Sequence, residues 1–276
     1  MNDSALALAR SLLFVPGNRP DRFQKALSSG ADAVIIDLED SVPPQEKEAS
    51  REHLLRHLSS LSDQGCLIVR INSPQTEWGM RDIELISQFS GISGLMVPKC
   101  ETSDDLKRVT EVAPDFPLLP IIESAAGYLA LESIALTRSV CRLVVGHVDF
   151  LADTGMSVSE DQRELDSLRF QVAMCTRAGG LAPAVDGVTL AVNDDVRLRD
   201  DVQRSIRFGM GGKLCIHPRQ IAIVHDAFEP SANDQKWAKR VVEASKISNG
   251  SALQLDGKMV DLPVVLMAKR LLSRVR

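Results

Sequence analysis

The sequence lacks the features that would place it in a membrane or on nucleic acid. No stretch of its 276 residues approaches the roughly 18 consecutive apolar residues of a membrane-spanning helix. The first ten residues carry no basic segment and too short an apolar stretch for a secretory signal. The net charge of -5 argues against a nucleic-acid footprint. These absences predict a cytoplasmic protein with neither nucleic-acid nor membrane partners.

The sequence also lacks patterned cysteines. Its 5 cysteines have no CxxC spacing, and their odd number argues against a disulfide framework. Most of them fall within or beside apolar runs, which predicts reduced, buried thiols. No cluster of histidine and cysteine occurs, so a zinc site is not favoured. The cysteines are Cys66, Cys100, Cys141, Cys175 and Cys215.

What the chain does have is a regular alternation of short apolar runs and amphipathic stretches. Such alternation predicts βαβ units and a parallel sheet. Eight units, in a chain close to the roughly 250 residues of a typical barrel domain, predict a (β/α)₈ TIM barrel, with an open doubly wound sheet as the alternative. The predicted strands are 11–16, 33–38, 66–71, 94–98, 118–122, 142–148, 182–188 and 213–216. The predicted helices are 21–29, 45–61, 80–89, 103–112, 127–136, 162–178, 195–208 and 219–228.

The last part of the chain departs from this repeat. Residues 232–247 are predicted to form a helix that ends at Asn249-Gly250. A polar segment and a short basic helix then run to Arg276. We therefore predict a barrel domain at 1–230 and a helical extension at 231–276 that acts as a lid or a subunit contact.

Three of the apolar runs end in an ionic residue that a buried strand does not normally carry: Arg70, Glu123 and Asp149. The carboxyl ends of parallel strands meet at one face, where ligands bind. Two carboxylates suit Mg²⁺, which takes oxygen ligands and keeps several waters. We therefore predict a metal site at Glu123 and Asp149, with Arg70 polarising an anion. The alternative is an arginine–glutamate ion pair that braces the barrel mouth.

The second predicted strand ends in three acids within four residues, Asp37, Glu39 and Asp40. Strand alternation would place Asp37 and Glu39 on one side and Asp40 on the other. The acids are candidates to hold metal-bound waters from outside the metal's own ligand set. For Asp40, the alternative is a cap at the start of the following helix.

Basic residues follow the first strand, where a turn leads into a helix. The helix start, Arg19 and Lys25 predict a modest anion site. Lys99 and Lys213 would add positive charge to the same face as Arg70. Such a gathering in an acidic protein predicts a substrate that carries phosphate or carboxylate.

His217 precedes Pro218 at the end of the last predicted strand. Its imidazole is a candidate general base. The alternative is a structural or binding role, with a hydrogen bond to nearby backbone.

A series of short motifs, in order from about residue 10 to residue 270, carries a resemblance to a known family. The chain resembles the citrate lyase β-subunit-like family of the HpcH/HpaI aldolase superfamily, the CoA-thioester lyases. The motifs are Arg10-Ser-Leu-Leu-Phe-Val-Pro-Gly-Asn-Arg, Asp37-Leu-Glu-Asp-Ser-Val, Val69-Arg-Ile-Asn-Ser, Val97-Pro-Lys, Ile122-Glu-Ser-Ala, Val148-Asp-Phe, Gly212-Lys-Leu-Cys-Ile-His-Pro-Arg-Gln-Ile and Gly257-Lys-Met-Val-Asp.

The resemblance implies a barrel enzyme that forms a homo-oligomer, a trimer or a hexamer. By matching position, Glu123 and Asp149 would bind Mg²⁺ and Arg70 would bind substrate. Asp261 would match a catalytic aspartate that these lyases receive from a neighbouring subunit's tail. This agrees with the prediction above that the tail is a lid or a subunit contact.

The resemblance also implies a binding site for coenzyme A. Phe14, Arg19 and Lys25 would line its entrance, and Ile216 and His217 would contact the thioester part of the substrate. A stand-alone enzyme needs such an entrance, whereas a citrate lyase β subunit acts on a thioester held by a separate acyl carrier subunit.

The implied activity is Mg²⁺-dependent cleavage of a carbon–carbon bond in a 3-hydroxyacyl-CoA. The first candidate is (S)-citramalyl-CoA, which gives acetyl-CoA and pyruvate, and malyl-CoA, which gives acetyl-CoA and glyoxylate, is next. Small residues near the strand ends favour the larger substrate: Ser73, Ser124, Ala125 and Gly146. The alternatives are a carrier-dependent citrate lyase β subunit, a malyl-CoA thioesterase, a class II aldolase acting on free 2-oxo acids, and a non-catalytic subunit of a complex.

Overall fold

The computed structural model describes residues 5–61, 65–248 and 251–275. Within it the chain forms two compact units, Met1–Val224 and His225–Arg276. The first holds the barrel and the second the tail. The domain division predicted at residue 230 stays a prediction.

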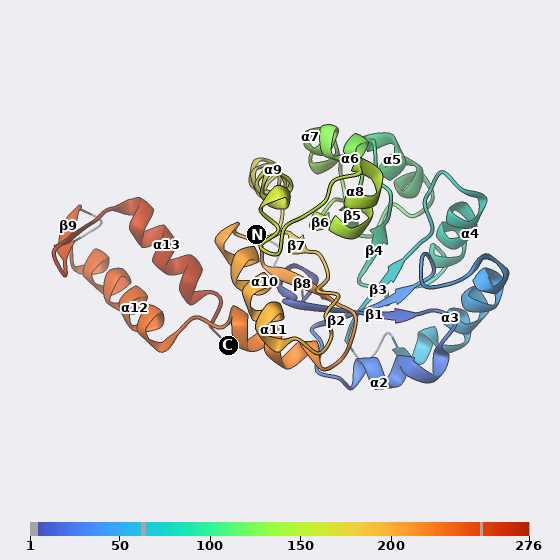
Figure 1. The fold of residues 1–276 in the computed structure, drawn as a ribbon, viewed down its shortest axis with the longest axis horizontal. Helices are drawn as coiled ribbons and strands as arrows, with labels where there is room; N and C mark the ends of the chain where they lie inside the picture. The colour runs from blue at the N-terminus through green and yellow to red at the C-terminus, as the bar shows by residue number, and fades with distance from the viewer. Residues whose placement is uncertain (1–4, 62–64, 249–250, 276) are drawn as a thin grey trace. The chain divides into compact units, whose positions relative to one another are not determined.

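The first unit is a closed barrel of eight parallel strands in sequence order, with helices around the outside (Figure 1). β8 pairs with β1, which closes the sheet and excludes the open doubly wound alternative. The strands are β1 (Ser11–Pro16), β2 (Ala33–Asp37), β3 (Cys66–Arg70), β4 (Gly94–Val97), β5 (Leu118–Ile122), β6 (Val144–Val145), β7 (Val185–Asp186) and β8 (Gly212–Cys215).

The strands are buried on both faces, which is why they appear in the sequence as continuous apolar runs. Alternate residues fill the barrel interior in layers. Their inward side chains form one core, which includes Leu12, Ile35, Ile68, Met96, Leu119, Val144, Val185 and Leu214. In the β2–β3 register Asp37 stands opposite Arg70, so the two ionic residues meet at the carboxyl end of the barrel.

The helices up to residue 228 follow the predicted order, with one helix added before β1, one added after β6, and the predicted helix 127–136 divided in two; the last of them crosses the boundary between the two units at Val224. α5 has the predicted bounds, and its start is a capping box in which Thr102 and Asp105 each accept from the other's backbone. Single turns of 3₁₀ helix lie at Pro20–Arg22, Pro44–Glu46 and Arg163–Leu165. The helices are α1 (Ala5–Leu8), α2 (Phe23–Leu27), α3 (Lys47–Leu61), α4 (Glu77–Ile86), α5 (Ser103–Val112), α6 (Ala125–Leu129), α7 (Leu131–Ala135), α8 (His147–Thr154), α9 (Asp166–Ala178), α10 (Asp195–Arg207) and α11 (Gln220–Phe228).

Two predicted strands are much shorter in the structure: the run 182–188 holds only β7, Val185–Asp186, and the run 142–148 departs further. The run 142–148 was expected to be a strand ending at Asp149, but β6 covers only Val144–Val145 and α8 begins at His147. A short apolar run has the same appearance in a buried strand and in a buried helix turn, so periodicity does not separate them. As a result Asp149 lies in the first turn of α8 rather than at a strand end.

An arginine closes the amino-terminal end of the barrel. Arg142 is fully buried, and its Nη1 donates to the carbonyl oxygens of Leu6 and Ala9 at 2.9 and 2.8 Å. Its Nε donates to the carbonyl of Pro183 at 2.7 Å. These bonds join the segments that enter β1, β6 and β7, so this end of the barrel is held by a structural plug.

The tail unit consists of α12 (Ala232–Ile247), a hairpin of β9 (Leu253–Leu255) and β10 (Lys258–Val260), and α13 (Leu262–Leu272). Its small core is formed by Ala238, Val241, Val260, Val265 and Ala268. The sequence predicts both helices but not the hairpin. The turn Asp256-Gly257, with both φ values positive, is the signal for a two-residue hairpin loop that was missed.

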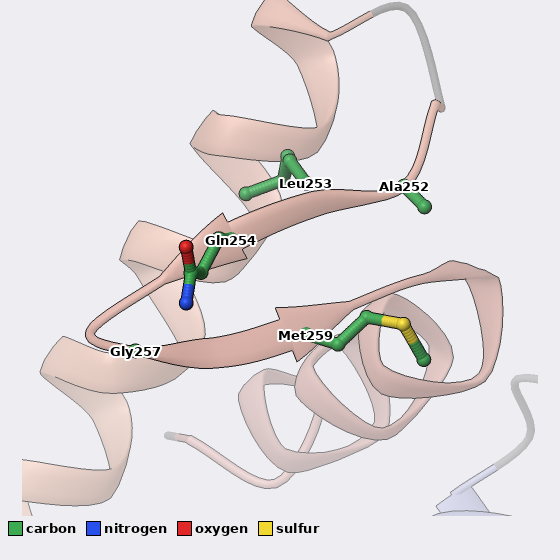
Figure 2. Close-up of a pocket in the computed structure, with 5 residues that line it drawn as sticks. All are labelled: Ala252, Leu253, Gln254, Gly257 and Met259. Carbon is green, nitrogen blue, oxygen red and sulfur yellow. The ribbon is translucent and has the colours of Figure 1, made fainter.

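A shallow hollow lies over this hairpin (Figure 2). Met259 pairs with Gln254 across the two strands, so their side chains share one face of the hairpin. None of the described helices, in the tail or in the barrel, is long and apolar enough to span a bilayer.

Candidate active site

The ionic residues predicted from the strand ends lie at the carboxyl end of the barrel. Arg70 is the last residue of β3, and Glu123 directly follows β5. Asp149 lies in the first turn of α8, which starts just after β6. Lys99, two residues after β4, contacts both carboxylates: its backbone N–H donates to Glu123 at 2.6 Å and its Nζ lies 3.8 Å from Asp149. The structure therefore brings these four residues together.

Glu123 is a buried carboxylate with one oxygen committed to the protein. Its Oε1 accepts the Lys99 N–H, and no donor in the described part of the chain reaches Oε2. Gly146 makes room for that second oxygen, because a Cβ there would lie 2.7 Å from Oε2. Burial, followed by the negative charge of Asp149, raises the pKa of Glu123 to about 7 against the hydrogen bond from Lys99. A nearby cation would restore its charged form.

Asp149 differs from Glu123 in being half-exposed. About half of its side chain is open to solvent, and within the described residues the partner of its carboxylate is the Lys99 ammonium. Its place in the first turn of α8 sets the carboxylate near the positive end of the helix dipole. Asp149 is thus an accessible anion beside a buried one.

These two carboxylates fit Mg²⁺ and do not fit zinc. No group of three or more His, Cys, Asp or Glu side chains able to hold a metal occurs within residues 5–61, 65–248 and 251–275. Mg²⁺ needs only one or two carboxylates and fills its other positions with water and substrate oxygens. The histidine nearest in sequence, His147, is buried, and burial lowers its pKa to about 4. The Oε2 of Glu123 and the carboxylate of Asp149 are the oxygens available to such an ion.

Arg70 forms an ion pair, as the alternative reading of the sequence expected, but its partners are Asp37 at the end of β2 and the two acids that follow, rather than Glu123. Its Nε and Nη2 each donate to Asp37 at 2.6 Å. Its Nη1 lies 3.0 Å from Glu39 and 3.3 Å from Asp40. The guanidinium also stacks over Phe14, with 4.9 Å between the Arg70 carbon and the ring centre. Arg70 is therefore held in a fixed orientation at the mouth.

The predicted alternation of the acids was wrong. Asp37, Glu39 and Asp40 all face Arg70, because the chain turns as it leaves β2. The Asp37 carboxylate accepts from the backbone N–H groups of Glu39 and Ser41 at 2.9 and 3.1 Å, which holds that turn. Asp40 does not cap the following helical turn either, since that turn starts at Pro44 with Pro43 as its N-cap.

The basic residues predicted to form one positive face do not all do so. Arg19 lies in the turn after β1, but its guanidinium forms a paired contact with Asp21 at 2.9 and 2.8 Å. Lys25 is exposed on α2. Lys213 is fully buried, with its Nζ 2.5 Å from the carbonyl of Gly187 and 3.7 Å from Asp186, so it adds no free charge to the mouth.

The residues after β8 are exposed. Ile216 and His217 follow the strand directly, next to the loop after β1, because β8 and β1 are neighbours in the barrel. The His217 Nδ1 accepts the backbone N–H of Arg219 at 3.2 Å. This bond is the structural role offered as the alternative for His217.

With this geometry in view, the chain can be compared with known proteins. The family model described as HpcH/HpaI aldolase/citrate lyase matches residues 10–218. The chain belongs to the HpcH/HpaI aldolase/citrate lyase family. It is 33% identical to a citrate lyase subunit beta-like protein of Deinococcus radiodurans, over 97% of each chain. It is 32% identical to a (3S)-malyl-CoA thioesterase of Cereibacter sphaeroides, over 96% of this chain and 94% of that one.

A solved structure resembles both the barrel and the tail. Protein CitE from Mycobacterium tuberculosis, crystallised with magnesium, acetoacetate and coenzyme A, has a TM-score of 0.83 and 32% identity to this chain. It covers 97% of this chain and 98% of its own. Other neighbours from the same organism are crystallised with magnesium and pyruvate or oxaloacetate. The family and these relatives support a lyase.

Asp261 lies in the tail unit. It is the N-cap of α13, and its Oδ1 lies 3.4 Å from the backbone nitrogen of Val264. A catalytic role for Asp261 stays a prediction.

Proposed function

We propose that this protein is a Mg²⁺-dependent lyase that cleaves the carbon–carbon bond of a 3-hydroxyacyl-CoA. The first candidate substrate is (S)-citramalyl-CoA, which yields acetyl-CoA and pyruvate, and malyl-CoA is the second. The observation that carries this proposal is the pair Glu123 and Asp149, with free oxygens, beside the fixed guanidinium of Arg70.

Glu123 and Asp149 would hold the metal ion, and a bidentate 2-oxo acid suits its remaining positions. When bound, Mg²⁺ supplies Lewis-acid stabilisation of negative charge on a substrate oxygen. Gly146 and the Lys99 N–H fix the Glu123 carboxylate, so its free oxygen is aimed before the ion arrives. The protein's part at this position is to present oriented carboxylates.

Arg70 would stabilise the other half of the reaction. As the substrate's hydroxyl loses its proton, the bond between the second and third carbons breaks, and its electron pair becomes the enolate of the thioester. Arg70 supplies positive charge at that enolate oxygen, and its acid partners and Phe14 hold it in place. Protonation of the enolate carbon then gives acetyl-CoA.

The coenzyme A portion would enter beside β1 and β8. Phe14 lies within β1, two residues before its end, and contacts Arg70, while Arg19 and Lys25 follow it in the chain. Ile216 and His217 follow the neighbouring strand. Arg19 and Lys25 are exposed cations suited to phosphate groups, although a phosphate must first displace Asp21 from Arg19.

The choice of citramalyl-CoA depends on room for one methyl group. Gly146 does not bear on this choice, because a side chain at residue 146 would collide with Glu123 whichever substrate binds. Ser124 caps α6 through its bond from Gly127. Ser73 and Ala125 are therefore the small residues that remain available to admit a methyl, which is worth about 1–3 kcal/mol of discrimination.

A thioesterase is the second candidate function. The relatives named (3S)-malyl-CoA thioesterase align over nearly the whole chain. The same carboxylate pair would then hold an ion beside the thioester carbonyl. Water would attack the carbonyl carbon and release the thiol of coenzyme A, and no carbon–carbon bond would break. The products separate the two: a lyase releases acetyl-CoA, and a thioesterase releases free coenzyme A.

The tail unit would form the subunit contact of a homo-oligomer, a trimer or a hexamer, and would supply Asp261 as the acid or base at the acetyl-CoA methyl carbon. Support comes from large apolar side chains exposed around Asp261: Met259, Leu262, Leu266 and Met267. Mixing two inactive proteins, Asp261→Asn and Glu123→Gln, tests this. If Asp261 acts across subunits, mixed oligomers regain activity; if it acts within one chain, or not at all, they do not.

The deciding experiment is a coupled assay with Mg²⁺ on (S)-citramalyl-CoA and malyl-CoA. We expect pyruvate together with acetyl-CoA, and loss of both on adding EDTA. Glyoxylate would move the substrate to malyl-CoA, and free coenzyme A alone would establish the thioesterase. No product from either substrate, but activity on a citryl thioester carried by an acyl carrier protein, would make the chain a citrate lyase β subunit.

A further inference from the structure

Lys99 has an unusual backbone conformation at the mouth of the barrel. Its φ is +49°, in the left-handed region that residues other than glycine rarely adopt. This conformation aims its N–H at the Oε1 of Glu123, 2.6 Å away. Strain of this kind persists where surrounding structure enforces it, and it gathers at functional sites.

The side chain of Lys99 has a second, separate set of partners. Its Nζ lies 2.9 Å from Glu39, 3.5 Å from Asp40 and 3.8 Å from Asp149. It therefore links the acids after β2 to Asp149 in α8. The side chain is 45% exposed, so the ammonium stands at the open edge of the site rather than inside the barrel.

The charges around Lys99 do not balance. If all are ionised, five carboxylates face three cations, Arg70, Lys99 and the buried Lys47, which gives -5 + 3 = -2. Arg70 is engaged by Asp37, Glu39 and Asp40. Within the described residues, Lys99 is thus the cation that contacts Asp149. The carboxylates are Asp37, Glu39, Asp40, Glu123 and Asp149.

We propose that the Lys99 ammonium is a tethered counter-cation of the metal site, competing with Mg²⁺ for Asp149 and attracting the anionic substrate once the ion is bound. This inference rests on the proposed Mg²⁺ site. A positive charge 3.8 Å from a metal ligand repels a divalent cation there, so it weakens metal binding. The same charge at an open edge attracts a carboxylate substrate. The Lys99 charge therefore lowers the affinity of the site for Mg²⁺ and raises its affinity for the anionic substrate.

Replacing Lys99 by methionine isolates this charge. The backbone N–H that orients Glu123 remains, and methionine meets the same backbone strain as lysine. Lys99→Arg keeps the charge. Lys107→Met is a matched control, since it removes a lysine charge from an exposed pair with Asp104 on α5.

The test is isothermal titration of each full-length protein with Mg²⁺, followed by titration of the Mg²⁺-loaded protein with pyruvate. We expect Lys99→Met to lower the Kd for Mg²⁺ by about fivefold to tenfold and to raise that for pyruvate by a similar factor. Lys99→Arg and Lys107→Met should stay within about twofold of the original protein.

An unchanged or weaker Mg²⁺ affinity in Lys99→Met would overturn the inference, because the ammonium would then not compete. If the original protein and every variant fail to bind Mg²⁺, the proposed function falls together with it. If the original protein binds Mg²⁺ and Lys99→Met binds no more tightly, the proposed function stands and this inference alone is lost.

Discussion

Two buried arginines close the two ends of the barrel, and they do so in opposite ways. Arg142, at the amino end, forms no ion pair within the described residues and bonds to the backbone carbonyls of Leu6, Ala9 and Pro183. Burial lowers its pKa to about 10. Burial also lowers the pKa of Arg70, but the charge of Asp37 outweighs it and raises that pKa overall.

The difference shows what each end is built for. Carbonyl oxygens accept from the Nε and Nη1 of Arg142 without adding charge, and its buried Nη2 has no partner among the described residues, so the plug stabilises the fold and offers nothing to a ligand. Around Arg70 the carboxylates outnumber the cations, and their mutual repulsion destabilises the fold unless a further cation binds. Substitutions of Arg70, Glu123 and Asp149 should therefore change activity most, and substitutions of Arg142 should change stability alone.

The largest expected effect is the loss of activity on neutralising either metal carboxylate. Glu123→Gln and Asp149→Asn keep the shape of each side chain but remove the charge that would hold the ion. We expect kcat to fall at least about 10³-fold. Steady-state kinetics with saturating Mg²⁺ measures it, and circular dichroism should show the original fold. Glu111→Gln, on the exposed side of α5, is the control. Activity that survives loss of the bound ion would refute the site.

At the amino end, Arg142→Met should unfold the barrel more easily. The substitution leaves three backbone carbonyls without their donor, which costs about 3–5 kcal/mol in the free energy of unfolding. Urea denaturation measures this, with Arg207→Met on the surface of α10 as control. The molecules that remain folded should keep their kcat. A large fall in kcat with unchanged stability would reverse the comparison between the two ends.

Arg70→Lys sharpens the comparison by keeping the charge and removing the planar fork. A lysine cannot make the paired contact with Asp37 or hold the same place over Phe14. We expect kcat/KM to fall about 10²-fold. Arg169→Lys alters another buried arginine–aspartate pair, with Asp186, and should affect stability alone. Equal losses of kcat/KM in both variants would mean that Arg70 supports activity only by stabilising the folded structure, and not by contacting the substrate.

The parts of the fold that were predicted correctly follow from local signals. β1 and β5 have the expected bounds because they are continuous apolar runs that end where the chain meets a polar turn. α5 begins at a capping box that is visible in the sequence, Thr102 with Asp105. These signals lie within a few residues of each other, so the sequence alone carries them.

What was missed depends on contacts between distant segments. The β2–β3 register pairs Asp37 with Arg70, and no local pattern gives that register. The helix start at His147 moved Asp149 off the strand end. Lys99 was expected only as added positive charge, because its contacts with Glu39 and Asp149 join three different elements. Strand ends therefore predicted which residues gather at the mouth, but not how their charges pair.

The smallest expected effect is a dependence of stability on pH at Glu123. Its pKa in the metal-free fold is about 7, above its ordinary value of 4.5, so the folded protein binds the proton more tightly than the unfolded chain. Stability from this group is present below about pH 4.5 and is lost as pH rises towards 7. In EDTA, the original protein should lose about 2 kcal/mol of its free energy of unfolding between pH 5 and pH 8 because of this group. Glu123→Gln should not show this loss. Urea denaturation at both pH values checks it, with Glu111→Gln retaining the original slope. If Glu123→Gln keeps the pH dependence, another group causes it. The excess of negative charge at the carboxyl end, which a bound cation would neutralise, would then not be what destabilises the metal-free barrel.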